Sequence, residues 1–201
     1  GAFHTGVLVV PASMYGFRRM GSGSGTVTSI LRNSADASLW TGTDGNGIFR
    51  YGPGGVSNLT AANSGLDNNS VMALVQDRRG MVWIATYQGG LFTSVNGTVR
   101  HYAMQDGTGS ENMVALAYDP KADIIYAGSH GGGLSIISAA DGRLLRNIDD
   151  SAVKWVNSLH LNSDGLLWIG TFNGIYRYDK ATGRLINYDL GETGPQSRVY
   201  T

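Results

Sequence analysis

The sequence predicts an all-β fold built from repeated four-stranded antiparallel sheets, and three observations lead to this prediction. Four similar segments carry aromatic residues at spacings of 43, 43 and 42 residues, namely Trp40, Trp83, Tyr126 and Trp168. A segment with alternating apolar residues precedes each aromatic residue and ends in Asp or Asn. Glycine makes up 30 of the 201 residues, as expected where tight turns join many short strands. A fixed period of this length defines a repeated structural unit.

One repeat, residues 71–112, shows the expected strands in order. The first alternates apolar residues, the second carries Trp83, and Asn96–Gly97 joins the last two as a hairpin turn. Four antiparallel strands about every 43 residues, with an aromatic residue in the second, are typical of β-propeller blades. The expected strands of this repeat are 71–76, 81–86, 90–95 and 98–103.

The ends of the chain indicate how the repeats are organised. Residues 1–21 resemble the latter half of a repeat, and Val199 lies 43 residues after Val156. We therefore expect residues 1–201 to form one propeller segment, a partial propeller. Its expected parts are a partial blade (1–25), four blades (26–70, 71–112, 113–155 and 156–197) and the start of another blade (198–201).

An unclosed arc of this kind would leave apolar blade faces and strand edges in water. Self-association through the terminal blades is therefore expected. The alternative is a five-bladed ring that is closed by both ends of the chain.

Composition excludes several classes of partner. The formal net charge is zero, with 15 basic and 15 acidic residues spread along the chain. Binding to nucleic acid or to an anionic membrane needs a basic patch, so neither partner is expected. The chain has no cysteine, which excludes disulfides and thiolate metal sites. No apolar run approaches the roughly 18 residues of a membrane span.

The ionisable residues give no pattern that is typical of an enzyme. The four histidines (His4, His101, His130 and His160) lack a paired metal-binding spacing. The adjacent Asp149 and Asp150 would point in opposite directions on an extended strand. With Glu111 and Glu192 as the only glutamates, no glycosidase acid–base pair can be placed. We predict no catalytic residue, no metal, no cofactor and no enzymatic activity.

The loops after the second and fourth strands hold the candidate ligand-binding residues. A propeller places both kinds of loop on one face. Gly, Asn and Asp would suffice as turn formers, whereas Tyr87, His130 and Phe172 are not turn residues, and mixed aromatic and amide groups suit sugar or polar ligands. Incidental loop packing is the alternative. The candidates are Asp44, Asn46, Tyr87, Gln88, His130, Trp155, Phe172 and Asn173.

The recurring aromatic residues have a different expected role. A large ring at one repeated position fills the wedge between neighbouring sheets. Trp40, Trp83, Tyr126 and Trp168 are therefore expected to be buried structural anchors.

The repeated pattern W-[IT]-[GA]-T-x-x-G-[IL], preceded by V-x-x-[IL]-x-x-[DN], resembles the two-component regulator propeller repeats. The segments "DRRGMVWIATYQGGLF" and "NSDGLLWIGTFNGIYRYD" fit this pattern closely. The third repeat departs from it, with Tyr126 in place of Trp and Ser129 in place of Thr, and the first has a longer turn before Trp40.

The resemblance implies the extracytoplasmic, periplasmic sensor region of a bacterial hybrid two-component system. Such regions typically contain seven-bladed propellers and precede a membrane segment and a histidine kinase. Kinase activity is not implied for these 201 residues. Oligosaccharides are the ligands that the resemblance implies. The alternatives are a protein-interaction scaffold, which would present a broad and flat patch, and a propeller lyase or glycosidase, which would need convergent carboxylates or a metal-bound histidine.

Overall fold

The structure, a computed structural model, describes residues 7–9, 18–20, 25–102 and 110–188. It is all-β, with four four-stranded antiparallel sheets, which confirms the predicted fold class. Expectations that concern residues 1–6 and 189–201, including His4, Glu192 and the start of another blade at 198–201, lie outside the described residues. Within the described part of the chain, no helix is long and apolar enough to span a membrane.

In each large sheet the four strands pair in sequence order. A short two-stranded sheet pairs β1 (Val7–Val9) with β2 (Arg18–Met20). The first large sheet contains β3 (Val27–Arg32), β4 (Leu39–Thr43), β5 (Gly47–Gly52) and β6 (Gly55–Leu59), and the second contains β7 (Val71–Gln76), β8 (Val82–Thr86), β9 (Gly90–Val95) and β10 (Thr98–His101). The third contains β11 (Met113–Asp119), β12 (Ile124–Ser129), β13 (Gly133–Ser138) and β14 (Leu144–Ile148), and the fourth contains β15 (Val156–Leu161), β16 (Leu167–Thr171), β17 (Gly174–Asp179) and β18 (Arg184–Tyr188).

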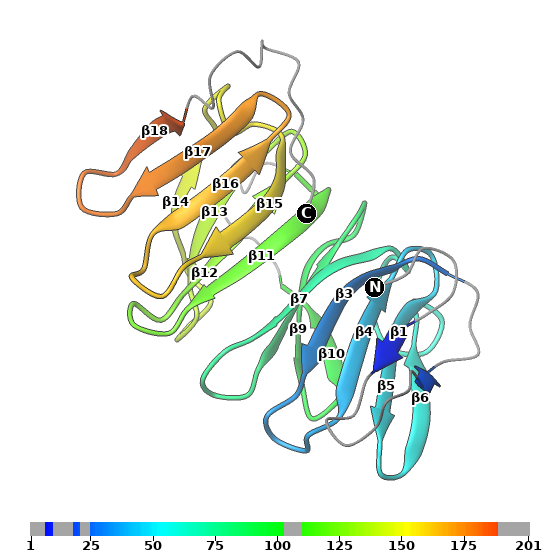
Figure 1. The fold of residues 1–201 in the computed structure, drawn as a ribbon. Helices are drawn as coiled ribbons and strands as arrows, with labels where there is room; N and C mark the ends of the chain where they lie inside the picture. The colour runs from blue at the N-terminus through cyan, green and yellow to red at the C-terminus, as the bar shows by residue number, and fades with distance from the viewer. Residues whose placement is uncertain (1–6, 10–17, 21–24, 103–109, 189–201) are drawn as a thin grey trace.

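The sheets stand side by side as an arc, joined along their first strands (Figure 1). Strand β3 contacts β7, β7 contacts β11, and β11 contacts β15. The last strand of each sheet therefore lies at the outer edge of the arc. This is the arrangement of adjacent propeller blades.

In the second repeat, β7 and β9 have the predicted bounds, whereas β10 ends at His101, before the predicted end at residue 103. Tyr102 still donates its N–H to the carbonyl of Leu91, at 2.8 Å. Its ring packs on Trp83, with 5.4 Å between the ring centroids.

Three of the four aromatic anchors are buried between neighbouring sheets. Trp40 lies in a core with Val82 and Ile84 of the second sheet. Trp83 packs similarly on the third sheet, and Tyr126 on the fourth. Each of the three is 1% exposed. The repeated aromatic position is therefore explained by sheet-to-sheet packing.

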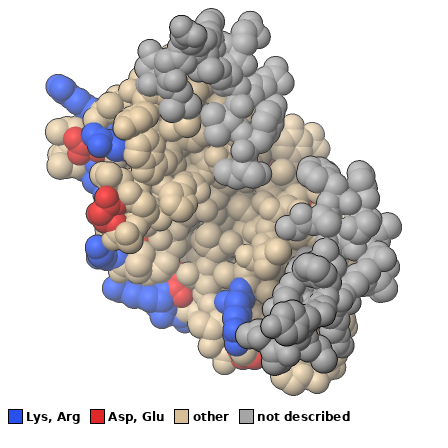
Figure 2. All heavy atoms as spheres, viewed as in Figure 1, with Lys and Arg blue, Asp and Glu red and all other residues tan. Residues whose placement is uncertain are grey.

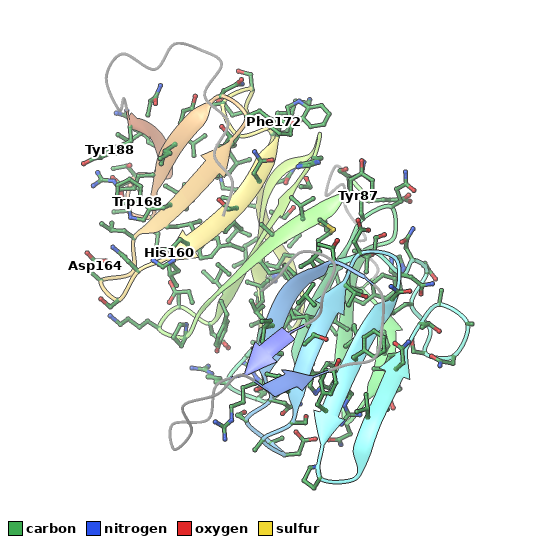
Figure 3. All side chains as sticks on the ribbon, turned by 45° about the vertical axis from the view of Figure 1, so that its right-hand side comes forward. Tyr87, His160, Asp164, Trp168, Phe172 and Tyr188 are labelled. Atoms are coloured by element: carbon green, nitrogen blue, oxygen red, sulfur yellow. The ribbon has the colours of Figure 1, made fainter. Side chains whose placement is uncertain are left out.

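Trp168 differs from the expectation, because it is only half-buried. Its position in β16 matches that of the other anchors, but β15–β18 is the last described sheet, and no described sheet packs beyond it. The ring instead lies against Tyr188 of β18, with 5.0 Å between the centroids (Figure 3). Burial at this position therefore requires a following sheet.

The small residue two positions after the anchor is explained by a close approach of the next sheet. A Cβ atom at Gly128 would lie 2.4 Å from Cγ1 of Val156, the first residue of β15. At Gly42 the corresponding distance to Cγ1 of Val71 is 2.9 Å. Both distances are shorter than non-bonded carbon atoms allow. Glycine therefore lets the first strand of one sheet pack directly on the second strand of the sheet before it.

The Asp or Asn that ends each first strand organises the following turn. In the second sheet, Oδ1 of Asp77 accepts the backbone N–H groups of Arg79 and Met81, and Oδ2 accepts Nε1–H of Trp83 at 3.3 Å. In the fourth sheet, Oδ1 of Asn162 accepts the N–H of Leu166 at 2.7 Å. This side chain thus caps the turn, and in the second sheet it also holds the anchor.

Asp119 of the third sheet has an additional partner from the fourth. The Lys180 ammonium donates a hydrogen bond to Oδ2 of the buried Asp119 and lies 5.7 Å from the centroid of the Tyr126 ring. Burial by itself would raise the pKa of Asp119. The Lys180 hydrogen bond, together with the N–H groups of Ala122 and Lys121, outweighs burial and lowers this pKa below its ordinary value of 3.8.

We predict that Lys180→Met lowers the free energy of unfolding by about 1–3 kcal/mol at neutral pH, because it leaves a buried carboxylate without its cation. A carboxyl group whose pKa is lowered by folding stabilises the protein above the unfolded pKa, and this contribution disappears as pH falls through the folded pKa. The difference between the two proteins should therefore shrink as pH falls, and it should vanish only below the folded pKa of Asp119, which lies under 3.8. Urea denaturation at pH 7 and at decreasing pH measures it, and a difference that persists at the lowest pH would contradict the role of Asp119.

Candidate functional site

The loops between the second and third strands of the four sheets have a common framework. The last residue of each second strand is Thr or Ser, and its hydroxyl donates to the carbonyl of the glycine that begins the third strand. The distances are 2.7 Å in the first sheet, 3.0 Å in the second, 3.2 Å in the third and 3.0 Å in the fourth. Ser129, which departs from the Thr pattern, therefore keeps the same bond. This hydrogen bond closes each loop across the end of its sheet.

A second hydrogen bond fixes each loop to the segment that enters the same sheet. The N–H of Asp44 donates to the carbonyl of Thr26, and that of Tyr87 to the carbonyl of Ser70. His130 and Phe172 are held in the same way by the carbonyls of Asn112 and Trp155. The four junctions are therefore structurally equivalent, and the side chains that they present can be compared directly.

At three neighbouring junctions the side chains form a continuous aromatic platform, which consists of Tyr87, His130, Trp155 and Phe172. The ring centroids of Tyr87 and His130 lie 6.3 Å apart, and those of His130 and Phe172 lie 5.4 Å apart. Trp155 lies 5.8 Å from His130 and 6.0 Å from Phe172. Figure 3 shows Tyr87 and Phe172 at the same end of the sheets, opposite Asp164. The sequence predicted this shared face, and the structure brings these four candidates into contact.

The hydrogen bonds that hold the loops do not explain why residue 155 is a tryptophan. At the equivalent junctions, the residue whose carbonyl holds the loop is Thr26, Ser70 or Asn112. A small polar side chain therefore suffices for the backbone bond. Trp155 is nevertheless a large apolar side chain that is 45% exposed. An exposed ring that packing does not require is a feature of binding surfaces.

The platform continues into a polar region at the first junction. The hydroxyl of Ser70 donates to Oδ1 of Asp44 at 2.7 Å, while the carbonyl of Ser70 holds Tyr87. Asp44 is exposed and Asn46 is half-buried. The face thus changes from carboxylate and amide groups at the first sheet to aromatic rings at the second, third and fourth.

Two residues that the sequence did not single out hold His130. Nε2 of His130 lies 3.2 Å from Oδ1 of Asn157, and the Ser110 hydroxyl donates to the carbonyl of His130 at 2.7 Å. His130 also forms a β-bridge with Trp155. The Asn157 contact therefore orients the imidazole within the platform, while the Ser110 bond and the β-bridge hold the backbone of His130. No spacing rule links Ser110 or Asn157 to the aromatic residues, so only the fold reveals them.

The remaining candidates lie beside the platform. Gln88 is exposed, with a left-handed backbone (φ 60°). Asn173 is exposed too, and its N–H donates to the Thr171 hydroxyl at 3.0 Å. Among the described residues, no group of three His, Cys, Asp or Glu side chains could hold a metal ion.

The fold and this face define a protein of β-propeller blades, with an aromatic surface at the end where the second and fourth strands of each sheet finish. Residues 65–88, from the approach to β7 through Gln88, match the two-component regulator propeller family. This confirms the resemblance that the repeated sequence pattern indicated. Comparison of the sequence with curated proteins gave no significant match.

Two similar solved structures are of the same extracellular domain from B. thetaiotaomicron. One is described as part of a one-component system and the other as part of a hybrid two-component system. The first is 21% identical over 98% of this chain, with a TM-score of 0.76, and the second is 19% identical over 83%, with a TM-score of 0.70. Virginiamycin B lyase from Staphylococcus aureus is 18% identical over 84% of this chain and 57% of its own, with a TM-score of 0.65.

At these identities the likeness shows the propeller fold alone. The chain spans about a quarter of the length of the extracellular domain that it resembles, 27% in one structure and 25% in the other.

Proposed function

We propose that this chain is a non-enzymatic, ligand-sensing portion of a bacterial two-component signalling receptor, located on the extracytoplasmic, periplasmic side, and that it responds to oligosaccharides. The observation that carries the proposal is the aromatic platform, in which Trp155 is exposed at a position that needs only a small polar residue. The family match of residues 65–88 supports the receptor context. The extracellular two-component domain with the same fold supports it as well.

The chemistry of the platform suits a sugar. Aromatic faces accept the C–H groups of a pyranose or furanose ring, which would be excluded from water between ligand and protein. Asn157 and Asp44 offer oxygen acceptors at the edges of the platform, where sugar hydroxyl groups can donate. An elongated oligosaccharide would lie across neighbouring junctions and contact more than one ring.

We expect at least one oligosaccharide to bind and none to be turned over. The panel contains neutral oligomers (cello-, xylo-, manno-, galacto-, arabino- and chito-oligosaccharides), chitosan oligomers, and acidic oligomers of galacturonate and hyaluronan. A ligand present at about 100 times its Kd stabilises the folded state by about 2.7 kcal/mol, which appears as a rise in the unfolding temperature. Calorimetric titration then gives Kd for each hit, and product analysis of the same samples reports turnover. Absence of binding throughout the panel would overturn the sensing proposal, and cleavage of a bound oligosaccharide would overturn the non-enzymatic part.

A further inference from the structure

The loops around the aromatic platform carry a net negative charge, although the formal net charge of the whole chain is zero. The described loops at this end are 44–46, 60–70, 87–89, 110–112, 130–132, 149–155 and 172–173. They contain five acidic side chains and one basic side chain, a formal charge of −4 with His130 neutral. All five carboxylates are exposed. These charged residues are Asp44, Asp67, Glu111, Asp149, Asp150 and Lys154.

The opposite end of the same sheets is close to balanced. Its loops (33–38, 53–54, 77–81, 96–97, 120–123, 139–143, 162–166 and 180–183) hold five acidic and five basic side chains, a formal charge of zero. Figure 2 shows blue and red groups beside one another along the lower-left edge, where the first strands of the third and fourth sheets end. Several of these charges are paired there, including Arg78 and Arg79 with Asp123.

Four of the five carboxylates belong to the loops that carry the rings or to segments hydrogen-bonded to those loops. Asp149 and Asp150 precede Trp155 in one loop, and Glu111 precedes Asn112, whose carbonyl holds His130. Asp44 contacts Ser70, whose carbonyl holds Tyr87.

The single ammonium of these loops is already compensated. Nζ of Lys154 lies 3.3 Å from Oδ1 of Asp149. A ligand on the platform would therefore meet a surface without an unpaired cation in the described loops, surrounded by negative charge.

We infer that the platform accepts neutral or amino-sugar oligosaccharides and rejects acidic ones such as uronates and sulfated glycans. The inference rests on the proposed function, with the rings as the contact surface and the carboxylates as the source of charge selectivity. The rings cannot provide this selectivity, because stacking on an aromatic face is available to charged and uncharged sugars alike. At 8–10 Å and at low salt, each exposed carboxylate changes the affinity for a charged ligand about two- to threefold.

The test uses the tightest-binding neutral oligosaccharide of the panel and the same molecule after oxidation of one terminal CH₂OH to a carboxylate. The oxidised probe should bind at least about tenfold more weakly at low salt, and the gap should shrink as salt is added. In the Glu111→Gln/Asp150→Asn variant, the ratio of the Kd of the oxidised probe to the Kd of the neutral probe should fall about fivefold. The Asp141→Asn/Asp164→Asn variant, which removes two charges at the opposite end of the sheets, should leave it unchanged.

Other outcomes separate this inference from the proposed function. If acidic oligomers are the tightest ligands of the panel, or if the oxidised probe binds as well as the neutral one, the charge selectivity is wrong and the sensing role stands. If no oligosaccharide of any charge binds, the proposed function fails and the charge selectivity fails with it.

Discussion

Replacing Trp83 with alanine is expected to lower the free energy of unfolding by about 3–5 kcal/mol. The ring is 1% exposed and packs in the core shared by the second and third sheets. Its Nε1–H also donates to the buried Asp77 carboxylate, which would lose this partner. Total stabilities of single domains are commonly 5–15 kcal/mol, so the loss would be a large fraction of the whole. Equilibrium urea denaturation measures it.

Trp168→Ala is the matched control for this prediction. It removes the same side chain at the equivalent position of the fourth sheet, where the ring is half-buried and lies against Tyr188. Because the loss of stability follows the apolar area removed from water, we expect less than half of the cost of Trp83→Ala. Equal costs at the two positions would show that packing of the next sheet is not what stabilises the anchor, as would a cost below about 1 kcal/mol at Trp83.

The architecture could be predicted because the same sequence pattern recurs in each repeat. Alternating apolar residues, an aromatic residue in the second strand and glycine at fixed offsets recur four times. The strands 71–76 and 90–95 were therefore placed at the bounds that the structure shows. The shared face of Tyr87, His130 and Phe172 followed from the same periodicity, since equivalent loops of a propeller lie at one end.

The sequence could not supply what depends on one sheet meeting another. Trp168 has the same local pattern as Trp83, and only the absence of a described following sheet distinguishes its environment. The pairing of Lys180 with Asp119 spans 61 residues and follows no spacing rule. Asn157 reaches His130 only because β15 of the fourth sheet packs on the third sheet, whereas Ser110 reaches it through the pairing of β11 with β12.

Trp155→Ser should abolish most oligosaccharide binding while leaving the fold intact. Serine is the residue at the equivalent junction before β7, where its carbonyl makes the same bond to the following loop. The backbone framework should therefore persist, and the exposed indole should be a small loss for stability. For binding, removal of a central tryptophan costs about 2 kcal/mol or more, which is about thirtyfold in Kd.

Calorimetric titration of Trp155→Ser with the tightest ligand of the panel tests the aromatic platform most directly. Trp155→Phe, which keeps an aromatic face, should retain most of the affinity, and Leu145→Ser, which removes an exposed apolar side chain from β14, should retain all of it. The expected result is a Kd at least about thirtyfold weaker for Trp155→Ser alone, with an unfolding temperature close to that of the unmodified protein. An unchanged Kd in Trp155→Ser would contradict the assignment and place the ligand elsewhere on the protein.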